Sequence, residues 1–490
     1  MLVKLSDNSF VRFIGEYVYV NNQLSKQDMF LNSTGADFFK EISRIPRSID
    51  EIVNSLYLLY GESVSYDMLY KDFNDFIEEM ILYSFLIKGE TIEVINDADK
   101  RFTYSNNNLQ RFVNRLGLYR GETKDSLQFM REISLSSPQL NGLQFELTSR
   151  CNERCIHCYI PNSKKDCGSD LPIEKVLSLI DEFADMGGLG VTLSGGEVFL
   201  YKDLMKVIQY CRKRDLQISI LSNLIALKDL QIPILKEANI AVLQVSLYSM
   251  DPKVHDKITT KEGSYRRTSS AIEKLIAADI PLQIACPIMK ANYKGYKGVL
   301  KFAQSKKCRS QADFIMMAQS DLCTDNLVNR ISLEETEFVI KEILKYDIDY
   351  RAWLLLPKDV KKEILLNRDK FSNSSFCGAG RNDLCITSNG DVYPCAGWQG
   401  MVVGNVYNST IESIWNNSAQ LNKVRSIKQS DFPKCMDCDV RDYCSPCLMR
   451  NFNENNGDMF KTAKHFCDVA LLTKKLVKEY MSNMEKAENP

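Results

Sequence analysis

Apolar and polar residues alternate with two different periods along the middle of the chain. Short apolar stretches of strand length recur from about residue 141 to 320, and segments with helical spacing of apolar residues separate them. Such alternation implies parallel strands joined by right-handed crossovers. The pattern predicts an α/β fold built on a partial (β/α)6 TIM-type barrel, with its chemistry at the C-terminal ends of the strands. The expected strands are 143–147, 190–194, 217–222, 241–247, 283–289 and 313–318.

Residues 1–95 predict a smaller, separate domain. Ser48 and Glu51 form a possible capping box before an apolar helical run that Gly61 would end, and a second helix is expected over 65–86. The order of two strands, then helices, then a strand suits a winged-helix-like fold. The expected strands are 10–15, 17–22 and 85–89.

The other segments divide by composition. The sequence predicts a polar linker with some helix at 96–140, a mostly helical linker at 321–375, a cysteine-dense domain at 376–470 and a C-terminal helix at 471–490.

Charge and length narrow the class of protein. The chain has 490 residues, and its 62 basic and 63 acidic side chains leave a formal net charge of −1, so we expect neither a nucleic-acid nor a membrane partner. It shows no signal-peptide pattern and no membrane-length apolar run, which predicts a cytoplasmic protein.

The cysteines are clustered rather than spread for disulfides. None of the 16 precedes Cys151, and eight fall between Cys377 and Cys467. In a large chain without a secretion signal, this distribution indicates metal or redox chemistry.

The first cluster, Cys151, Cys155 and Cys158, follows directly after the first expected strand of the barrel. A [4Fe–4S] cluster normally takes four cysteines, so three would leave one iron open for another ligand. Zinc completed by a histidine is the alternative, although His157 adjoins Cys158 too closely for comfortable joint ligation. The spacing alone leaves both metals open.

The spacing C-x3-C-x2-C followed by the aromatic Tyr159 resembles the signature of the radical S-adenosylmethionine (SAM) enzymes. The resemblance implies that the open iron binds SAM, which is cleaved to a 5′-deoxyadenosyl radical that abstracts a hydrogen atom. Cys151, Cys155 and Cys158 would then be the catalytic cluster ligands, and Tyr159 would lie at the cofactor.

A second motif of that family ends the second expected strand. Gly195, Gly196 and Glu197 resemble its GGE motif, which meets the amino group of SAM. A carboxylate suits an ammonium group, and glycines let the backbone approach a ligand closely. The resemblance also implies SAM contacts from strand-end residues, here Ser222, Asn223 and Ser246.

The C-terminal cysteines resemble the SPASM extension of radical SAM enzymes, which holds two auxiliary [4Fe–4S] clusters. This chain departs from the usual pattern between Cys444 and Cys447, where two residues intervene instead of three. The resemblance implies three [4Fe–4S] clusters in all, with Cys385 the least certain ligand, and the alternative is a pair of zinc-ribbon-like sites. The inner cluster would take Cys377, Cys385, Cys395 and Cys447, and the outer one Cys435, Cys438, Cys444 and Cys467.

Residues 1–95 resemble, in size, position and element order, the PqqD-like element that binds a precursor's leader peptide as an added strand. The resemblance therefore implies a maturase of a ribosomally synthesised peptide, reduced by a flavodoxin or ferredoxin. We expect sactipeptide-type thioether crosslinks from cysteine sulfur to carbon.

Four other functions remain open. They are carbon–carbon crosslinking, sulfatase maturation, a non-enzymatic zinc scaffold, and epimerisation, in which Cys286 near the end of the fifth strand would return the hydrogen atom.

Overall fold

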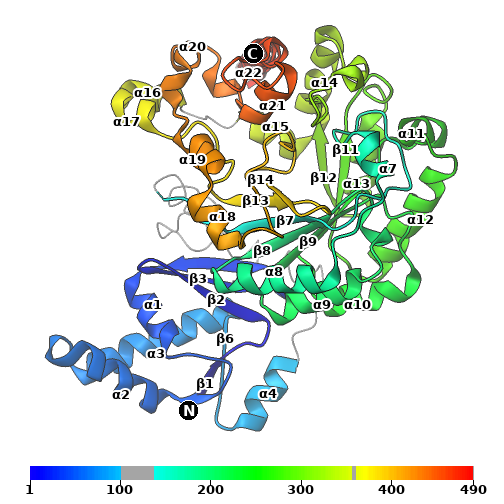
Figure 1. The fold of residues 1–490 in the computed structure, drawn as a ribbon. Helices are drawn as coiled ribbons and strands as arrows, with labels where there is room; N and C mark the ends of the chain where they lie inside the picture. Colours follow the sequence, from blue (N-terminus) through cyan, green and yellow to red (C-terminus); the bar gives the residue numbers. More distant parts are fainter. Residues whose placement is uncertain (101–136, 356–359, 489–490) are drawn as a thin grey trace.

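The computed structural model describes residues 1–100, 137–355 and 360–488, so most of the linker expected at 96–140 lies outside the described residues. The first hundred residues form a domain of two small antiparallel sheets, ordered β5-β1-β6 and β2-β3-β4, with four helices (Figure 1). Its elements are β1 (Leu2–Leu5), β2 (Ser9–Ile14), β3 (Tyr17–Asn22), β4 (Gln27–Leu31), α1 (Ser33–Lys40), β5 (Arg47–Ser48), α2 (Ile49–Tyr60), α3 (Tyr66–Leu82), β6 (Leu86–Gly89) and α4 (Ile92–Lys100).

The expected hairpin, capping box and third strand of this domain are confirmed. Strands β2 and β3 pair antiparallel, and the Ser48 N–H donates to the Glu51 carboxylate at 3.3 Å at the start of α2. Gly61 follows this helix with φ +59°. The pattern missed β1, β4 and α1, and α3 ends at Leu82, earlier than expected. The winged-helix assignment stays a prediction.

Six consecutive parallel strands form the central sheet, in the order β12-β11-β10-β9-β8-β7. Helices connect them, as the alternation predicts (Figure 1). The strands are β7 (Gly142–Glu146), β8 (Gly190–Ser194), β9 (Gln217–Ser222), β10 (Val242–Ser246), β11 (Leu282–Pro287) and β12 (Arg309–Asp313). The helices are α7 (Asn162–Asp166), α8 (Ile173–Asp185), α9 (Leu204–Lys213), α10 (Ile232–Glu237), α11 (Pro252–Thr259), α12 (Ser264–Ala277) and α13 (Tyr296–Ser305).

The sixth strand was wrongly expected at 313–318. The strand is β12, which lies just before that apolar run and ends the sheet on one side. Its sequence, RSQAD, is mostly polar and half exposed, so apolar periodicity cannot reveal it. The apolar residues that follow are buried beyond the strand end, as Phe314 and Ala318 are.

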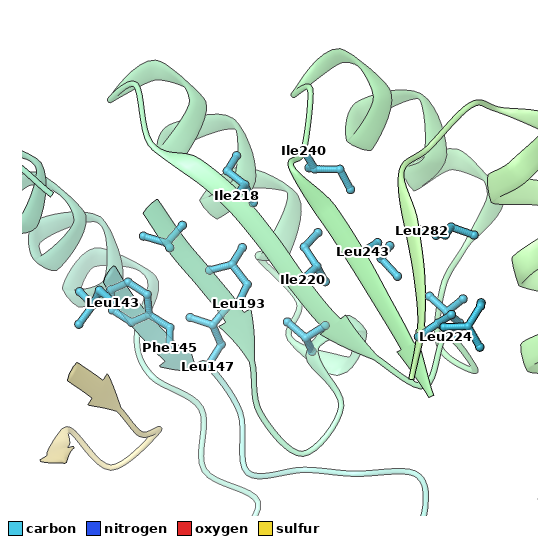
Figure 2. Packing of buried hydrophobic residues seen from close by; sticks show 14 of the residues in the cluster. Leu143, Phe145, Leu147, Leu193, Ile218, Ile220, Leu224, Ile240, Leu243 and Leu282 are labelled. Carbon is cyan, nitrogen blue, oxygen red and sulfur yellow. The ribbon is translucent and has the colours of Figure 1, made fainter. Parts of the chain in front are cut away.

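The two faces of this sheet differ in polarity. Leu143, Phe145, Leu193, Ile220 and Leu243 belong to the buried cluster on the helix-covered face (Figure 2). The intervening residues point to the opposite face and are mostly polar, as in Gln144, Thr192, Ser219, Gln244 and Gln283. Buried parallel strands usually read as continuous apolar runs. The alternation therefore marks an inner face lined with hydrogen-bonding groups.

The C-terminal part extends the same sheet. Strand β13 (Asp383–Ile386) pairs parallel to β7, and β14 (Asp391–Tyr393) and β15 (Gly404–Asn405) add antiparallel pairs, giving nine strands in all. The tail helix expected at 471–490 begins earlier, because α22 includes Cys467. The helices here are α14 (Leu333–Tyr346), α15 (Ile348–Leu355), α16 (Val360–Leu366), α17 (Arg368–Asn373), α18 (Ile411–Asn417), α19 (Ala419–Ser426), α20 (Pro433–Met436), α21 (Leu448–Glu454) and α22 (Lys464–Glu488). None of the helices in the described ranges is both long and apolar enough to cross a lipid bilayer.

The N-terminal domain packs against the edge of the sheet at which the parallel strands begin (Figure 1). Arg12 on β2 donates to the carbonyls of Gly188, Arg214 and Asp215, each at 3.2 Å. Lys26 donates to the carbonyls of Asn239 and Ile240, each at 2.9 Å. Carbonyls just before β8, β9 and β10 thus hold this domain in place.

Replacing Arg12 by Ala should loosen this docking without unfolding either domain. Three carbonyls would lose a charged hydrogen-bond donor, which costs roughly 1–3 kcal/mol of local stability. Because a less stable region opens more often, we expect about tenfold faster amide exchange around residues 214–217. Hydrogen–deuterium exchange read by mass spectrometry measures it. Lys40→Ala, which removes an exposed cation paired with Asp37, is the matched control and should leave that exchange unchanged.

Candidate radical SAM and iron–sulfur site

The first cysteine cluster lies in the loop after β7, at the carboxyl edge of the sheet. Two contacts fix this loop. Arg150 Nη2 pairs with Asp170 Oδ2 at 2.6 Å, and the Arg154 N–H donates to the Thr259 carbonyl at the end of α11 at 3.1 Å. These contacts anchor the loop to Asp170, ahead of α8, and to the end of α11.

The three thiols of this loop share one small volume. Burial raises the pKa of Cys155 well above its usual value, and the charges of Glu153, Cys158 and Cys151 raise it further. Burial opposes a charge on Lys165, yet the nearby Cys158, Cys151 and Cys155 raise the pKa of its ammonium group overall. The structure thus brings the predicted cysteines together beside one buried cation.

The glycines of the predicted GGE motif make a contact that the sequence did not suggest. The Gly196 N–H donates to the Thr148 carbonyl and the Glu197 N–H to the Arg150 carbonyl, each at 2.8 Å. A Cβ on Gly195, where φ is +146°, would lie 2.4 Å from the Thr148 carbonyl oxygen, and one on Gly196 would lie 2.3 Å from that of Arg150. Their close approach is therefore to the backbone that leads into the cysteine loop.

The Glu197 carboxylate is the point where three loops meet. It accepts hydrogen bonds from Ser222 Oγ at 2.7 Å, from the Asn223 N–H at 2.8 Å and from the Phe199 N–H at 3.1 Å. Asn223 Nδ2 in turn donates to Asn152 Oδ1 of the cysteine loop at 2.7 Å. Burial raises the pKa of Glu197 to about 7 against these donors. A carboxylate has about four acceptor positions, so one remains for an ammonium ligand.

Ser246 lies at the end of β10, beside a tyrosine that the sequence reading missed. The Ser246 hydroxyl hydrogen-bonds the Tyr248 hydroxyl, which lies 3.9 Å from Cys155 Sγ. The Tyr248 ring meets His157 edge-on, with ring centroids 4.9 Å apart. Its place two residues after a strand end was the available indication in the sequence.

A buried hydrogen-bonded chain backs the cysteine loop from α11 and α12. The Tyr248 N–H donates to His255 Nδ1 at 3.2 Å, so His255 Nε2 carries the proton and donates to Ser264 Oγ at 3.1 Å. Ser264 then donates to the carboxylate of Glu153, which lies between Cys151 and Cys155. This chain of hydrogen bonds fixes the side chain of Glu153 and gives His255 a local structural role.

Tyr159 faces the C-terminal domain. Its hydroxyl donates to Glu146 Oε1 at 3.2 Å, and Gln399 Nε2 donates to the same oxygen at 2.8 Å. Burial raises the pKa of Glu146 to about 7. Lys164 Nζ donates to Gln399 Oε1 at 3.1 Å and closes the group. Glu146 and Gln399, both missed in the sequence, thus join the cysteine loop to the auxiliary domain.

The inner set of C-terminal cysteines is brought together in part. Burial raises the pKa of Cys377 and, to about 12, that of Cys395, and the charge of Cys447 raises both further. Cys385 is buried on β13 beside Cys395 and Glu146. Three of the predicted ligands therefore surround one site, and Cys385 lies on its side toward the cysteine loop.

The outer set also converges. Burial raises the pKa of Cys444 to about 11, and the charges of Cys467, Cys435 and Cys438 add to it against the opposing charge of Arg441. Cys467 enters from the first turn of α22, far along the chain from the other three. The other three predicted ligands are therefore near enough for their charges to act on Cys444.

The cysteine sets supply the thiolates that a [4Fe–4S] cluster takes, because its ligands are normally cysteines. Within residues 1–100, 137–355 and 360–488, no three Cys, His, Asp or Glu side chains are close enough to bind one metal ion.

Unpartnered N–H donors support the same assignment. Trp398 is fully buried in an apolar cluster against which Cys377 and Cys395 pack, and its indole nitrogen has no acceptor among the described residues. Arg441 beside the outer set has two such nitrogens. Cluster sulfurs are acceptors that such donors can meet.

Cys286, the thiol considered for epimerisation, lies on the helix-covered face of β11. It is buried in the same apolar cluster as Ile284 and Ile288, and burial raises its pKa to about 12. Its sulfur lies 3.7 Å from the Tyr248 carbonyl. This thiol therefore faces away from the polar inner face.

Two family profiles match the chain. That of the Radical SAM superfamily covers residues 145–303, and that of an iron–sulfur cluster-binding domain, SPASM, covers residues 377–439. The first contains the cysteine loop and the GGE motif, and the second contains five of the C-terminal cysteines.

Two curated proteins and one solved structure are similar to most of this chain. The antilisterial bacteriocin subtilosin biosynthesis protein AlbA of Bacillus subtilis is 26% identical over 64% of this chain and 68% of its own length. An AdoMet-dependent heme synthase of Methanosarcina barkeri is 25% identical over 65% of this chain and 93% of its own. Streptococcus suis SuiB bound to its precursor peptide SuiA has a similar fold, with a TM-score of 0.62, 15% identity and coverage of 92% and 97% of the two chains.

Replacing Gly196 by Ala should disable the site. The new methyl group would collide with the Arg150 carbonyl at 2.3 Å, and overpacking of this kind costs roughly 1–3 kcal/mol. Because relieving this collision requires the cysteine loop to move, we expect loss of SAM binding, which calorimetry measures. Gly187→Ala is the control, because its φ is +86° but nothing lies within 4 Å of its Cβ position. Equal SAM affinity in both variants would contradict this account.

Glu197 should make the SAM-free protein less stable as the pH rises. The pKa of Glu197 is raised to about 7 in the folded protein, against 4.5 for a glutamate in the unfolded chain. Between pH 4.5 and pH 7 the folded state therefore holds a proton that the unfolded state has lost. The resulting stability is fully present below pH 4.5 and is lost as the pH rises through 7, on the order of 3 kcal/mol. Denaturant unfolding across this range measures it. Glu197→Gln should reduce the slope and leave the part due to Glu146, whose pKa burial also raises to about 7, and an unchanged slope would refute the assignment.

Proposed function

We propose that this chain, which carries a radical SAM domain and a SPASM domain, is a maturase that forms thioether crosslinks in a ribosomally synthesised peptide. The observation that carries the proposal is the meeting of the cysteine loop, the GGE motif and the end of β9 at the Glu197 carboxylate. This arrangement leaves an anionic acceptor beside three thiols at the carboxyl edge of a parallel sheet, where such folds perform their chemistry.

The residues of this edge have distinct proposed tasks. Cys151, Cys155 and Cys158 would hold the catalytic [4Fe–4S] cluster, and Glu197 would accept the SAM ammonium group. Ser222 and Asn223 hold that carboxylate in place through their hydrogen bonds. When bound, the cluster and SAM supply a 5′-deoxyadenosyl radical for hydrogen abstraction from the substrate.

A peptide substrate is supported by the relatives and by the architecture. AlbA serves the biosynthesis of a bacteriocin, and SuiB binds a precursor peptide. The SuiB fold matches 92% of this chain, which necessarily includes most of the N-terminal domain. The polar inner face also offers amide and hydroxyl groups to a peptide backbone, as Gln144, Thr192 and Gln244 do. We infer that the N-terminal domain binds the leader by strand addition, with β4 an available edge.

Thioether formation is favoured over epimerisation by the placement of the spare thiol. An epimerase needs a hydrogen donor at the radical, and Cys286 faces the helices instead. The eight C-terminal cysteines would hold two auxiliary clusters, which can accept the electron released when a substrate sulfur closes the ring. A flavodoxin or ferredoxin would supply electrons to the catalytic cluster.

Anaerobic reconstitution tests the cofactor assignment. The protein should bind about twelve irons, and replacing Cys151, Cys155 and Cys158 by Ala should abolish SAM cleavage while keeping about two thirds of the iron. Deoxyadenosine released, iron and labile sulfide are measured together. Zinc in place of iron, or iron lost from all sites at once, would contradict the assignment.

Incubation with a small cysteine-containing peptide encoded beside the gene tests the reaction. Each thioether should remove two hydrogen atoms from the peptide, and fragmentation in the mass spectrometer should locate a sulfur-to-carbon link. Cys286→Ala is the matched cysteine control and should keep full turnover. An unchanged mass with inverted residues, lost in Cys286→Ala, would establish epimerisation instead.

A further inference from the structure

Arg441 is a buried cation whose hydrogen-bonding capacity is mostly unused. It lies in the short turn Arg441–Tyr443 between Cys438 and Cys444, and only 6% of its surface is exposed. Its Nη2 donates to the neutral amide oxygen of Gln429 at 2.6 Å. Its Nε and Nη1 have no acceptor among the residues that the structure describes.

Such an arrangement is costly without a further partner. A guanidinium group has five N–H donors and stays protonated, so burial removes its hydration without removing its charge. Buried arginines are accordingly paired with anions or hydrogen-bonded throughout. The free nitrogens of Arg441 therefore indicate an anionic acceptor that the protein atoms alone do not provide.

The surroundings of Arg441 indicate where that acceptor lies. The Arg441 N–H donates to the Cys438 carbonyl at 3.3 Å, and the Cys444 N–H donates to the Arg441 carbonyl at 3.2 Å, so the residue lies directly between two of the outer cysteines. On another side, the guanidinium carbon lies 5.9 Å from the centre of the Phe376 ring. One side thus meets an aromatic ring, while the field of the cation falls on the outer cysteines.

We propose that Arg441 is a positioning residue for the outer cluster, donating hydrogen bonds to its sulfur atoms and raising its reduction potential. The inference rests on the proposed function in one respect, namely that Cys435, Cys438, Cys444 and Cys467 bind a [4Fe–4S] cluster. A cluster with four thiolates is anionic and gains a further negative charge on reduction. A nearby cation and N–H donors stabilise the reduced form more than the oxidised form.

The consequence is a difference between the two auxiliary sites. The unpartnered donor near the inner set is the neutral indole N–H of Trp398, in the apolar cluster against which Cys377 and Cys395 pack. The outer set has the buried cation Arg441 in its own loop. The outer cluster should therefore hold an electron more readily than it would without Arg441, which suits a site that receives electrons from the reaction or passes them to the surface.

A redox titration followed by electron paramagnetic resonance tests the proposal. The titration uses the full chain with Cys151, Cys155 and Cys158 replaced by Ala, so that only the auxiliary clusters contribute. The signal that disappears in Cys444→Ala identifies the outer cluster. In Arg441→Gln the midpoint potential of this signal should fall, while the other auxiliary signal stays in place. In Arg441→Lys, which keeps the charge but loses the planar guanidinium group, the midpoint potential should fall by less.

Arg368→Gln is the matched control. Arg368 pairs with Asp437 at 2.8 Å, and Asp437 lies between Cys435 and Cys438 in the sequence. Both side chains of this pair are largely exposed to water. Removing this screened charge should leave the potential unchanged.

Each outcome decides the matter. An outer cluster with normal iron content and an unchanged potential in Arg441→Gln would overturn the proposal. Loss of the cluster from Arg441→Gln but not from Arg441→Lys would support the role of the charge, whereas loss from both would show that packing alone matters and would overturn it. Absence of the cluster from the parent protein would instead refute the proposed function.

Discussion

The backbone contact between residues 195–197 and 148–150 is the constraint on which the site depends. Two adjacent strand ends approach so closely that neither Gly195 nor Gly196 has room for a Cβ atom. Two hydrogen bonds of 2.8 Å hold this approach and set the distance between the cysteine loop and Glu197. This backbone contact therefore sets where the Glu197 carboxylate and the three thiols lie relative to each other. Backbone positions vary less than side-chain rotamers do. Any ligand that bridges them meets a site already organised before it binds.

The nine-stranded sheet connects the cysteine loop after β7 with the C-terminal cysteines. Because β13 pairs with β7, Cys385 and Gln144 are neighbours across two strands, and the cysteine loop follows the same β7. The contact of Tyr159 and Gln399 with Glu146 crosses this junction as well. Helices cover one face of the sheet and polar side chains line the other. The polar inner face therefore extends from the strand ends near Glu197 to Cys385 of the inner cysteine set.

The sequence predicted what depends on local pattern and on the spacing of reactive residues. Five of the six parallel strands, the capping box at Ser48 and the grouping of the cysteines follow from periodicity or from motifs. The strand β12 escaped because its residues are polar and half exposed. Glu146 and Arg441 escaped for a different reason: their partners are distant in sequence, and a single acidic or basic residue shows nothing about burial. The face on which Cys286 lies likewise required the register of β11.

The placement of the N-terminal domain constrains how a peptide could reach the site. Its contacts are with carbonyls before β8, β9 and β10, at the opposite end of the strands from Glu197. Strand β9 alone has six residues, which at ~3.3 Å per residue separates the two ends by about 20 Å. A leader held on that domain must then be joined to the modified residues by at least ~6 extended residues, and by more if the chain passes around the sheet edge. On the proposed function, leader binding and crosslink position would be coupled through the length of that connecting segment, and shortening it should move the crosslinks rather than weaken binding.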